Sequence, residues 1–134
     1  MIPVPSRLYF DPPSPKLPLN GKRIAIKDVY DLKGTPTSAS SRDYQSFIGK
    51  ASKTAEMIQR LIRAGAVIVG KTKTAQFASG EFAPHWVNYS CPLNPRGDGY
   101  LEPDCSSTGS GAAIAAYAWL DYSIGTDSKS LAFT

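Results

Sequence analysis

The sequence has little of the residues from which metal centres and disulfide frameworks are built. Its 134 residues include one histidine, His85, and two cysteines, Cys91 and Cys105. No second cysteine lies at the CxxC spacing of a zinc site, so we predict no metal centre. Because no export signal is visible, we expect both cysteines to be reduced thiols rather than a disulfide.

Long apolar runs are also absent. No apolar stretch approaches the ~20 residues that a membrane-spanning helix needs. The first ten residues have neither a basic start nor a continuous apolar segment, so no signal peptide is predicted. The contents of hydrophobic residues (42%) and charged residues (19%) are ordinary for a globular domain. We therefore expect a folded cytoplasmic domain without a membrane span.

Positive charge is unevenly distributed but nowhere concentrated. The formal net charge is +4, yet residues 1–73 hold 13 Lys and Arg against 5 Asp and Glu, and residues 74–134 hold 2 against 6. A basic half can indicate nucleic-acid binding. Because no three basic residues are consecutive, a solvated surface is the better interpretation, and nucleic-acid binding stays the lesser alternative.

The first half of the chain alternates between irregular segments and short strands. Residues 1–20 contain six of the eleven prolines, which predicts an extended arm rather than a helix or a central strand. Residues 23–27 predict a strand with Ile24 and Ile26 on one face. Residues 33–50 are rich in Gly, Ser, Thr and Pro and predict a loop.

A helix and a second strand follow this loop. Thr54 is the expected N-cap and Glu56 suits the positive first turn. Gly65 is placed to end the helix, and one helical face carries three apolar residues: Ile58, Leu61 and Ile62. Residues 66–69 then predict a buried strand. Strand, helix and strand form the right-handed crossover unit of an α/β sheet.

The second half of the chain predicts fewer regular elements. We expect a short helix over residues 74–79 and an irregular stretch over 84–103 with turn signals. A Gly-, Ala- and Ser-rich helix is expected over about 109–120, and a last strand over 122–125. The resulting fold class is α/β.

One motif in the sequence is misleading. Residues 65–72 match the phosphate-binding pattern GxxxxGK[ST] letter for letter. That pattern functions as a loop between a strand and a following helix. Here the four intervening residues are Ala, Val, Ile and Val, which favour a strand, and the predicted helix precedes them. We therefore reject nucleotide binding at this segment.

Three segments carry residues that could take part in a chemical reaction. The strand sequence IAIKD ends in Lys27, which is either a surface lysine or a buried amine whose lowered pKa would make it a base. Residues 105–113 place consecutive hydroxyls and glycines before a helix, either as a helix cap or as a hydroxyl and amides aimed at negative charge. Residues 124–128 form a small-residue turn after a strand and say little alone.

Together, and in this order, the three segments resemble the amidase-signature family. That family has an IKD strand end, a GGSSGGSAA-like stretch and a nucleophile turn GTDTGGS. In addition, residues 65–72 resemble its AGAVIVGKT segment, and Asn94-Pro95 resembles its NP turn. The resemblance covers about residues 20–128.

The resemblance implies a partial amidase-signature fold, which is α/β with a mixed β-sheet flanked by helices. Lys27 falls on the catalytic lysine, Ser106 on the bridging serine, and four residues on the oxyanion-binding nucleophile turn: Gly125, Thr126, Asp127 and Ser128. The implied reaction is hydrolysis of a small-molecule amide through an acyl-enzyme, with a Ser–Ser–Lys triad and without a metal or an organic cofactor.

The sequence departs from the family at the nucleophile. After Ser128 the family has Gly-Gly-Ser, whereas this chain has Lys129-Ser130-Leu131. Counted from Gly125, Leu131 occupies the nucleophile position, and Ser130 lies one residue early as a weak candidate. The resemblance is therefore to the N-terminal portion of a catalytic domain truncated before the nucleophile, and we expect this chain to be inactive.

These observations predict that the chain has three parts and that it can associate with a second copy of itself or with a homologue. The parts are a Pro-rich arm (1–20), a partial amidase domain (21–128) and a divergent tail (129–134). An incomplete sheet leaves strand edges unpaired. The alternative to an enzyme is therefore a binding or regulatory module that associates with itself or with a homologue through an exposed sheet edge.

Overall fold

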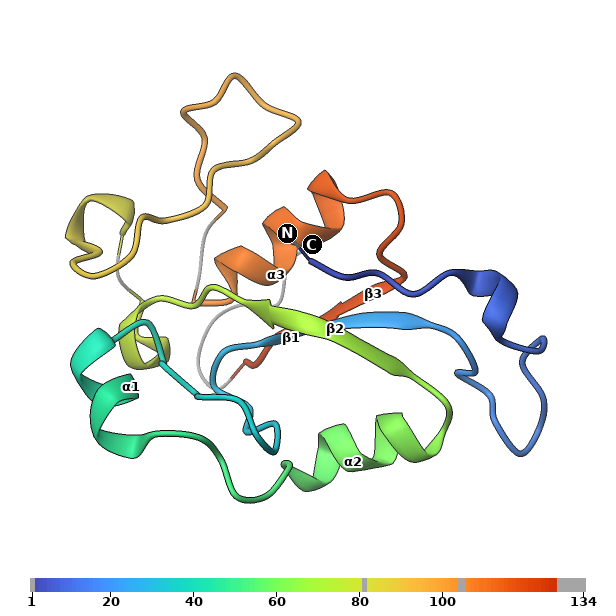
Figure 1. Cartoon of the computed structure of the whole chain (residues 1–134). Helices are drawn as coiled ribbons and strands as arrows, with labels where there is room; N and C mark the ends of the chain where they lie inside the picture. The colour runs from blue at the N-terminus through green and yellow to red at the C-terminus, as the bar shows by residue number, and fades with distance from the viewer. Residues whose placement is uncertain (1, 81, 104–105, 128–134) are drawn as a thin grey trace.

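The computed structural model describes residues 2–80, 82–103 and 106–127, in which three strands lie between helices (Figure 1). The strands are β1 (Arg23–Lys27), β2 (Val67–Thr72) and β3 (Tyr122–Ile124); the α-helices are α1 (Arg42–Ile48), α2 (Glu56–Arg63) and α3 (Thr108–Ala116); the 3₁₀ helices are η1 (Arg7–Tyr9), η2 (Gln76–Ala78) and η3 (Ala83–His85). No helix among these residues is long and apolar enough to cross a membrane.

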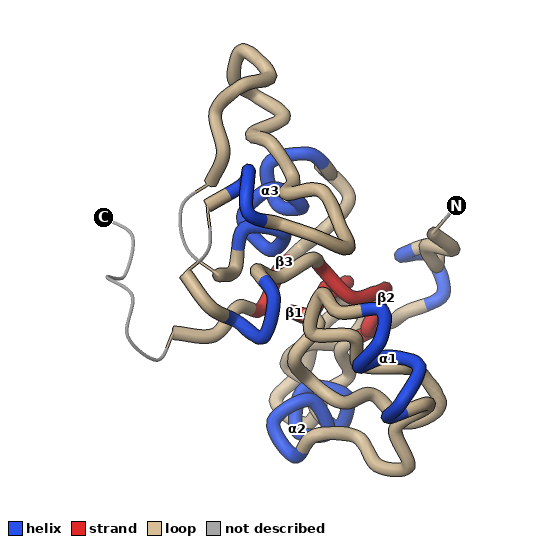
Figure 2. Tube along the Cα trace, turned by 90° about the vertical axis from the view of Figure 1, so that its left-hand side faces the viewer, coloured by secondary structure: helices blue, strands red, loops and turns tan. Residues whose placement is uncertain are grey.

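The sheet is parallel in all its described pairings and has the order β2-β1-β3. Helix α3 covers one face and α2 lies on the opposite face, as the edge-on view also shows (Figure 2). The prediction of an α/β fold is confirmed. The resemblance implies a mixed sheet, whereas the three described strands pair only in parallel.

Strand β1 is buried on both faces because it is the central strand. Ile24 and Ile26 are 1% and 0% exposed, and they form the core with Ile58 of α2 and Ala66. Strand β2 is only half-buried, since it has a neighbour on one side alone. The strand predicted over residues 66–69 is found at Val67–Thr72, so it is longer than expected, and it is also more exposed.

The described part of the proline-rich arm contains one helical turn, η1, and is otherwise irregular. It is fastened to the sheet by Arg23, whose guanidinium donates to the carbonyl of Pro5 at 2.7 and 3.1 Å. Asp121 accepts from Arg7 at 3.0 Å and from the amide of Arg23 at 2.9 Å. The arm thus lies against the amino ends of β1 and β3.

The prediction of a loop over 33–50 is wrong for α1. The Ser41 side chain caps this helix by accepting from the amide of Tyr44, and Asp43 suits its first turn. Gly49 ends it at φ 69°. The helix buries no residue, and its three apolar side chains, Tyr44, Phe47 and Ile48, are exposed although they fall at helical spacing.

Helix α2 is where expected, but its cap differs. Ala55 is the N-cap, and the Thr54 hydroxyl accepts from the amide of Lys33 at 3.0 Å instead. Ile58 is fully buried, whereas Ile62 is 43% exposed, so the apolar face is narrower than predicted. Gly65 follows the helix at φ 97°, in the left-handed region expected for it.

Helix α3 ends four residues earlier than predicted. Tyr117 is its C-cap, and the Tyr117 ring packs against Trp119 with centroids 5.1 Å apart. Leu120 is buried after the helix has ended. Strand β3 begins at Tyr122 as predicted and ends at Ile124.

Candidate active site

Lys27 is the last residue of β1 and its side chain is 0% exposed. It lies at the carboxyl end of the central strand, where parallel α/β sheets place their binding crevices. The alternative that Lys27 is a surface lysine is therefore wrong. A buried amine must find polar partners, because an unpaired one would be costly to desolvate.

Three hydroxyl groups surround the Lys27 amine. The Nζ atom lies 2.7 Å from Ser106 Oγ, 2.9 Å from Ser107 Oγ and 2.7 Å from Thr126 Oγ1. These hydroxyls come from the start of α3 and from the turn after β3. The fold therefore gathers the three segments that carry the resemblance around one nitrogen atom.

Ser107 links the lysine to the turn after β3. Its Oγ accepts from the Thr126 amide at 3.2 Å and donates to the Thr126 carbonyl at 3.1 Å. The Tyr30 hydroxyl also donates to the carbonyl of Gly125, at 3.3 Å. A Cβ at Gly125 would lie 2.8 Å from Ser107 Oγ, so a larger residue there would displace the Ser107 side chain. Both Ser107 and Tyr30 were missed as functional candidates, although Ser106 and Ser107 together match the two consecutive serines of the family's motif and are called the paired serines below.

The start of α3 packs closely against the segment that follows β2. The Gly109 amide donates to the Lys73 carbonyl at 3.1 Å, and a Cβ at Gly109 would lie 2.4 Å from backbone atoms of Lys73. Only glycine allows this approach. The glycine of the serine-rich motif therefore serves the packing that places Ser106 and Ser107.

The structure brings together most of the predicted site residues. Lys27 contacts both Ser106 and Thr126, and Gly125 precedes Thr126 in the chain. Asp127 is exposed at the end of the described turn. Ser128 and Ser130 lie outside the described residues.

The lysine of the misleading phosphate-binding motif is occupied elsewhere. Lys71 forms an ion pair with Asp28 at 3.1 Å and donates to Pro36 and Thr37, both at 2.8 Å. The segment Val67–Thr72 is strand β2, not a loop. The prediction that this segment is a strand rather than a loop is therefore confirmed.

Among the described residues, no group of three or more His, Cys, Asp or Glu side chains could hold a metal ion. Cys91 is a free thiol. Burial, and secondarily the Glu102 carboxylate, raises the pKa of Cys91. Cys105 lies outside the described residues.

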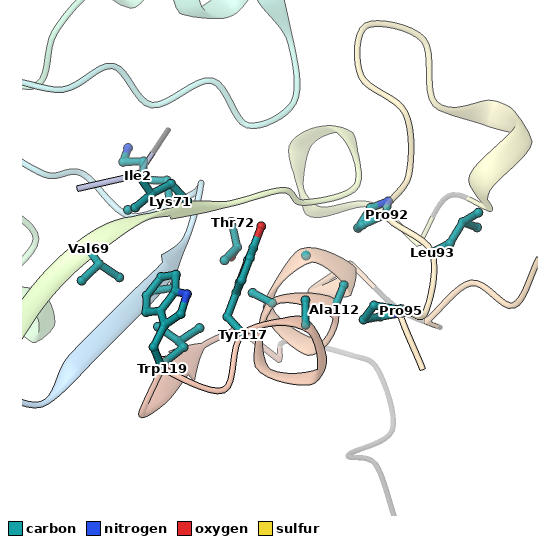
Figure 3. Close-up of a pocket in the computed structure, with 16 residues that line it drawn as sticks. Ile2, Val69, Lys71, Thr72, Pro92, Leu93, Pro95, Ala112, Tyr117 and Trp119 are labelled. Carbon is teal, nitrogen blue, oxygen red and sulfur yellow. The ribbon is translucent and has the colours of Figure 1, made fainter. Parts of the chain in front are cut away.

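A separate groove of about 310 Å³ lies on the α3 side of the sheet (Figure 3). It lies between β2 and α3, and the segment containing Pro92, Leu93 and Pro95 closes one side. Its lining is mostly apolar and includes Val69, Tyr117 and Trp119. Neither Lys27 nor Ser106 lines it, so the groove is distinct from the site formed by Lys27 and its three hydroxyl partners.

Comparisons with known proteins agree with the residue-level resemblance. The family model described as Amidase matches residues 9–129. The chain is 36% identical over 116 residues to Amidase 1 of Oryza sativa subsp. japonica, covering 87% of this chain and 26% of that protein. It is 42% identical over 110 residues to a glutamyl-tRNA(Gln) amidotransferase subunit of Chloroflexus aurantiacus, covering 82% and 22%.

The fold itself is similar to that of Kluyveromyces lactis allophanate hydrolase. The TM-score is 0.71 at 34% sequence identity, and the match covers 83% of this chain and 17% of that one. The chain spans about a quarter or less of the length of the relatives it matches.

Proposed function

The chain belongs to the amidase family, and from this membership we propose that it carries the proton-transfer half of a site that hydrolyses the carbon–nitrogen bond of a small amide. Lys27 is the proposed base and Ser106 the proposed bridging serine. One observation carries this proposal: Lys27 Nζ and Ser106 Oγ lie 2.7 Å apart, and both side chains are buried at the carboxyl end of the central strand.

The proposed chemistry is a proton relay. Neutral Lys27 accepts the proton of the Ser106 hydroxyl, while Ser106 takes the proton of the hydroxyl that attacks the amide carbonyl. When the acyl-enzyme forms, the same proton passes back through Ser106 to the leaving amine. Backbone amides of the turn that begins at Gly125 are the proposed oxyanion donors. The relay needs no metal or organic cofactor.

The nucleophile is the weak point of the proposed site. The family pattern puts it at Leu131, which cannot attack a carbonyl, and Ser130 lies one residue early. We propose that the chain is inactive with this sequence, and that its functional parts are the arm (1–20), the partial amidase domain (21–128) and the divergent tail (129–134).

Restoring the family's nucleophile turn tests this proposal. The triple variant Lys129→Gly, Ser130→Gly, Leu131→Ser should react at position 131 with a fluorophosphonate, as located by peptide mass spectrometry, whereas the unchanged chain should not. In the triple variant, Lys27→Ala or Ser106→Ala should abolish the labelling, and Lys53→Ala, an exposed lysine, should not. Labelling that survives both site substitutions, or a triple variant that stays unlabelled, would contradict the proposed relay.

A second candidate function is a non-enzymatic binding module. Strand β2 is an outer strand of the described sheet, and an apolar groove runs beside it. Such an edge can pair with a strand of another chain. Size-exclusion chromatography with light scattering, alone and with a full-length amidase, should then show association; an unassociating monomer would count against it.

Two further predictions, on nucleic-acid binding and on cellular location, can each be tested by a direct measurement. Nucleic-acid binding, the least favoured alternative, requires salt-dependent retention on an anionic matrix. A cytoplasmic location can be checked by fractionation of cells that express a tagged chain.

A further inference from the structure

Thr74 is a buried polar residue that the proposed relay does not use. It lies two residues after β2 and is 0% exposed, as is the next residue, Ala75. A buried threonine hydroxyl needs a hydrogen-bond partner, and the identity of that partner shows what the residue holds in place. Thr74 itself makes no contact with the Lys27 amine among those described above.

The partner of Thr74 is the backbone of Ser106. The Thr74 hydroxyl lies 2.9 Å from the Ser106 carbonyl oxygen and 3.0 Å from the carbonyl of Ala75. The Ala75 amide donates to the same Ser106 carbonyl at 3.1 Å. Ser106 is thus held by a side-chain donor and a backbone donor from consecutive residues.

The segment that contains Thr74 is itself fixed on both sides. The Ser40 hydroxyl donates to the Thr74 carbonyl. On the other side, the Lys73 carbonyl accepts from Gly109 in the first turn of α3. The segment Lys73–Ala75 therefore contacts Ser106, the first of the paired serines, and Gly109, two residues after the second.

The position of the Ser106 backbone determines the reach of its hydroxyl. Ser106 Oγ lies 2.7 Å from Lys27 Nζ, and a displacement of about 1 Å would break this hydrogen bond. We propose that Thr74 is a positioning residue, whose hydroxyl holds the Ser106 peptide so that the Ser106 side chain stays in contact with Lys27. The importance of that contact for a reaction rests on the proposed function; the positioning itself does not require turnover.

The test uses the lysine amine as its probe. In protein labelled with ¹⁵N-lysine, the Nζ signal of Lys27 is assigned by its loss in Lys27→Met. Thr74→Val removes the hydroxyl at nearly constant shape and should shift this signal and increase Nζ–H exchange with solvent about tenfold. Thr74→Ser keeps the hydroxyl and should restore both.

Thr72→Val is the matched control. Thr72 is also buried and is the last residue of β2, directly before this segment, but its hydroxyl bonds to Ser110 at 2.9 Å rather than to Ser106. It should leave the Lys27 signal close to that of the unchanged protein. An unaltered signal in Thr74→Val, an equal shift in Thr72→Val, or no rescue by Thr74→Ser would each overturn the proposal.

The outcome does not depend on whether the chain is an enzyme. If Thr74→Val and Thr74→Ala both fail to fold while Thr74→Ser folds, the hydroxyl serves stability rather than positioning, and the proposal is rejected. If the restored nucleophile turn is not labelled, the proposed function fails, but the Lys27 signal still decides the role of Thr74. Where labelling occurs, Thr74→Val should slow it and Thr74→Ser should not.

Discussion

At the scale of single residues, the two parts of the Lys27 side chain have different roles: the stem packs in the protein interior and the amine forms the proposed site. Its long apolar stem fills space in the core region, while its amine contacts three hydroxyls. Desolvating an amine opposes folding, so its replacement by an apolar group of similar shape need not weaken the fold. Burial here is more informative about function than about stability.

We therefore predict different outcomes for two substitutions of Lys27. Lys27→Met should change the free energy of unfolding by about 1 kcal/mol or less, because shape is retained. Lys27→Ala leaves a cavity and should destabilise by about 3 kcal/mol. Urea unfolding measures both. Equal destabilisation by the two variants would show that the amine, not the stem, supports the fold.

Cys91 offers a second test at this scale. Burial raises its pKa, with a further contribution from Glu102, so the folded state favours the protonated thiol. The resulting stabilisation is present below the pKa of the unfolded thiol and is lost as pH rises through the folded pKa. Because only the thiolate is alkylated, iodoacetamide should modify Cys91 with a midpoint at higher pH in the folded protein than in urea.

Peptide mass mapping distinguishes Cys91 from Cys105 in that experiment. Glu102→Gln removes the second cause of the shift and should move the midpoint partway back. Identical pH profiles in the folded and unfolded protein would contradict the effect of burial.

At the scale of elements, two glycines of α3 have opposite requirements. A Cβ at Gly109 would meet backbone atoms of Lys73 at 2.4 Å, whereas nothing lies within 4 Å of a Cβ at Gly111. Gly109→Ala should therefore destabilise by about 3 kcal/mol, since backbone must move. Gly111→Ala should stabilise by about 0.5–1 kcal/mol, since alanine favours the helix.

Thermal and urea unfolding of the two variants give this comparison directly. If Gly109→Ala were as stable as Gly111→Ala, the close packing of α3 on the segment after β2 would be wrong. Gly109→Ala should also displace the paired serines and alter the Lys27 Nζ signal, which Gly111→Ala should leave unchanged.

The elements also show which sequence signals were reliable. Strand β1 and the position of α2 followed from apolar spacing, because both bury the residues that define their patterns. Helix α1 was missed because it lies in a stretch whose Gly, Ser, Thr and Pro content predicted a loop, and the cap of α2 was misassigned because Thr54 bonds to Lys33 instead. Helix α3 ends at Ala116, before the residue that the apolar run predicted, because its C-cap Tyr117 has an extended backbone.

At the scale of the whole molecule, Asp121 joins the two ends of the described chain. Its carboxylate accepts from Arg7 and from the Arg23 amide, and Lys22 lies 3.7 Å away. We predict that Asp121→Ala frees the arm, so that trypsin cleaves after Arg7 several times faster under native conditions. Asp98→Ala, in the loop before α3, is the control and should leave that cleavage rate unchanged. Unaltered cleavage in Asp121→Ala would mean that Arg23 and Pro5 hold the arm without it.

The sequence by itself determined the α/β class, the strand at residues 23–27, the crossover through α2 and the family, because local spacing or ordered motifs indicate each of them. The position of that strand at the centre of the sheet was decided by the tertiary structure. The sequence also identified Lys27 and Ser106 as candidates, but only through resemblance. The tertiary structure alone decided that Lys27 is buried, that Ser107 and Thr126 share its amine, and that Thr74 supports Ser106. These contacts join residues far apart in the sequence, and such pairings arise from how the sheet and helices pack rather than from any periodicity along the chain.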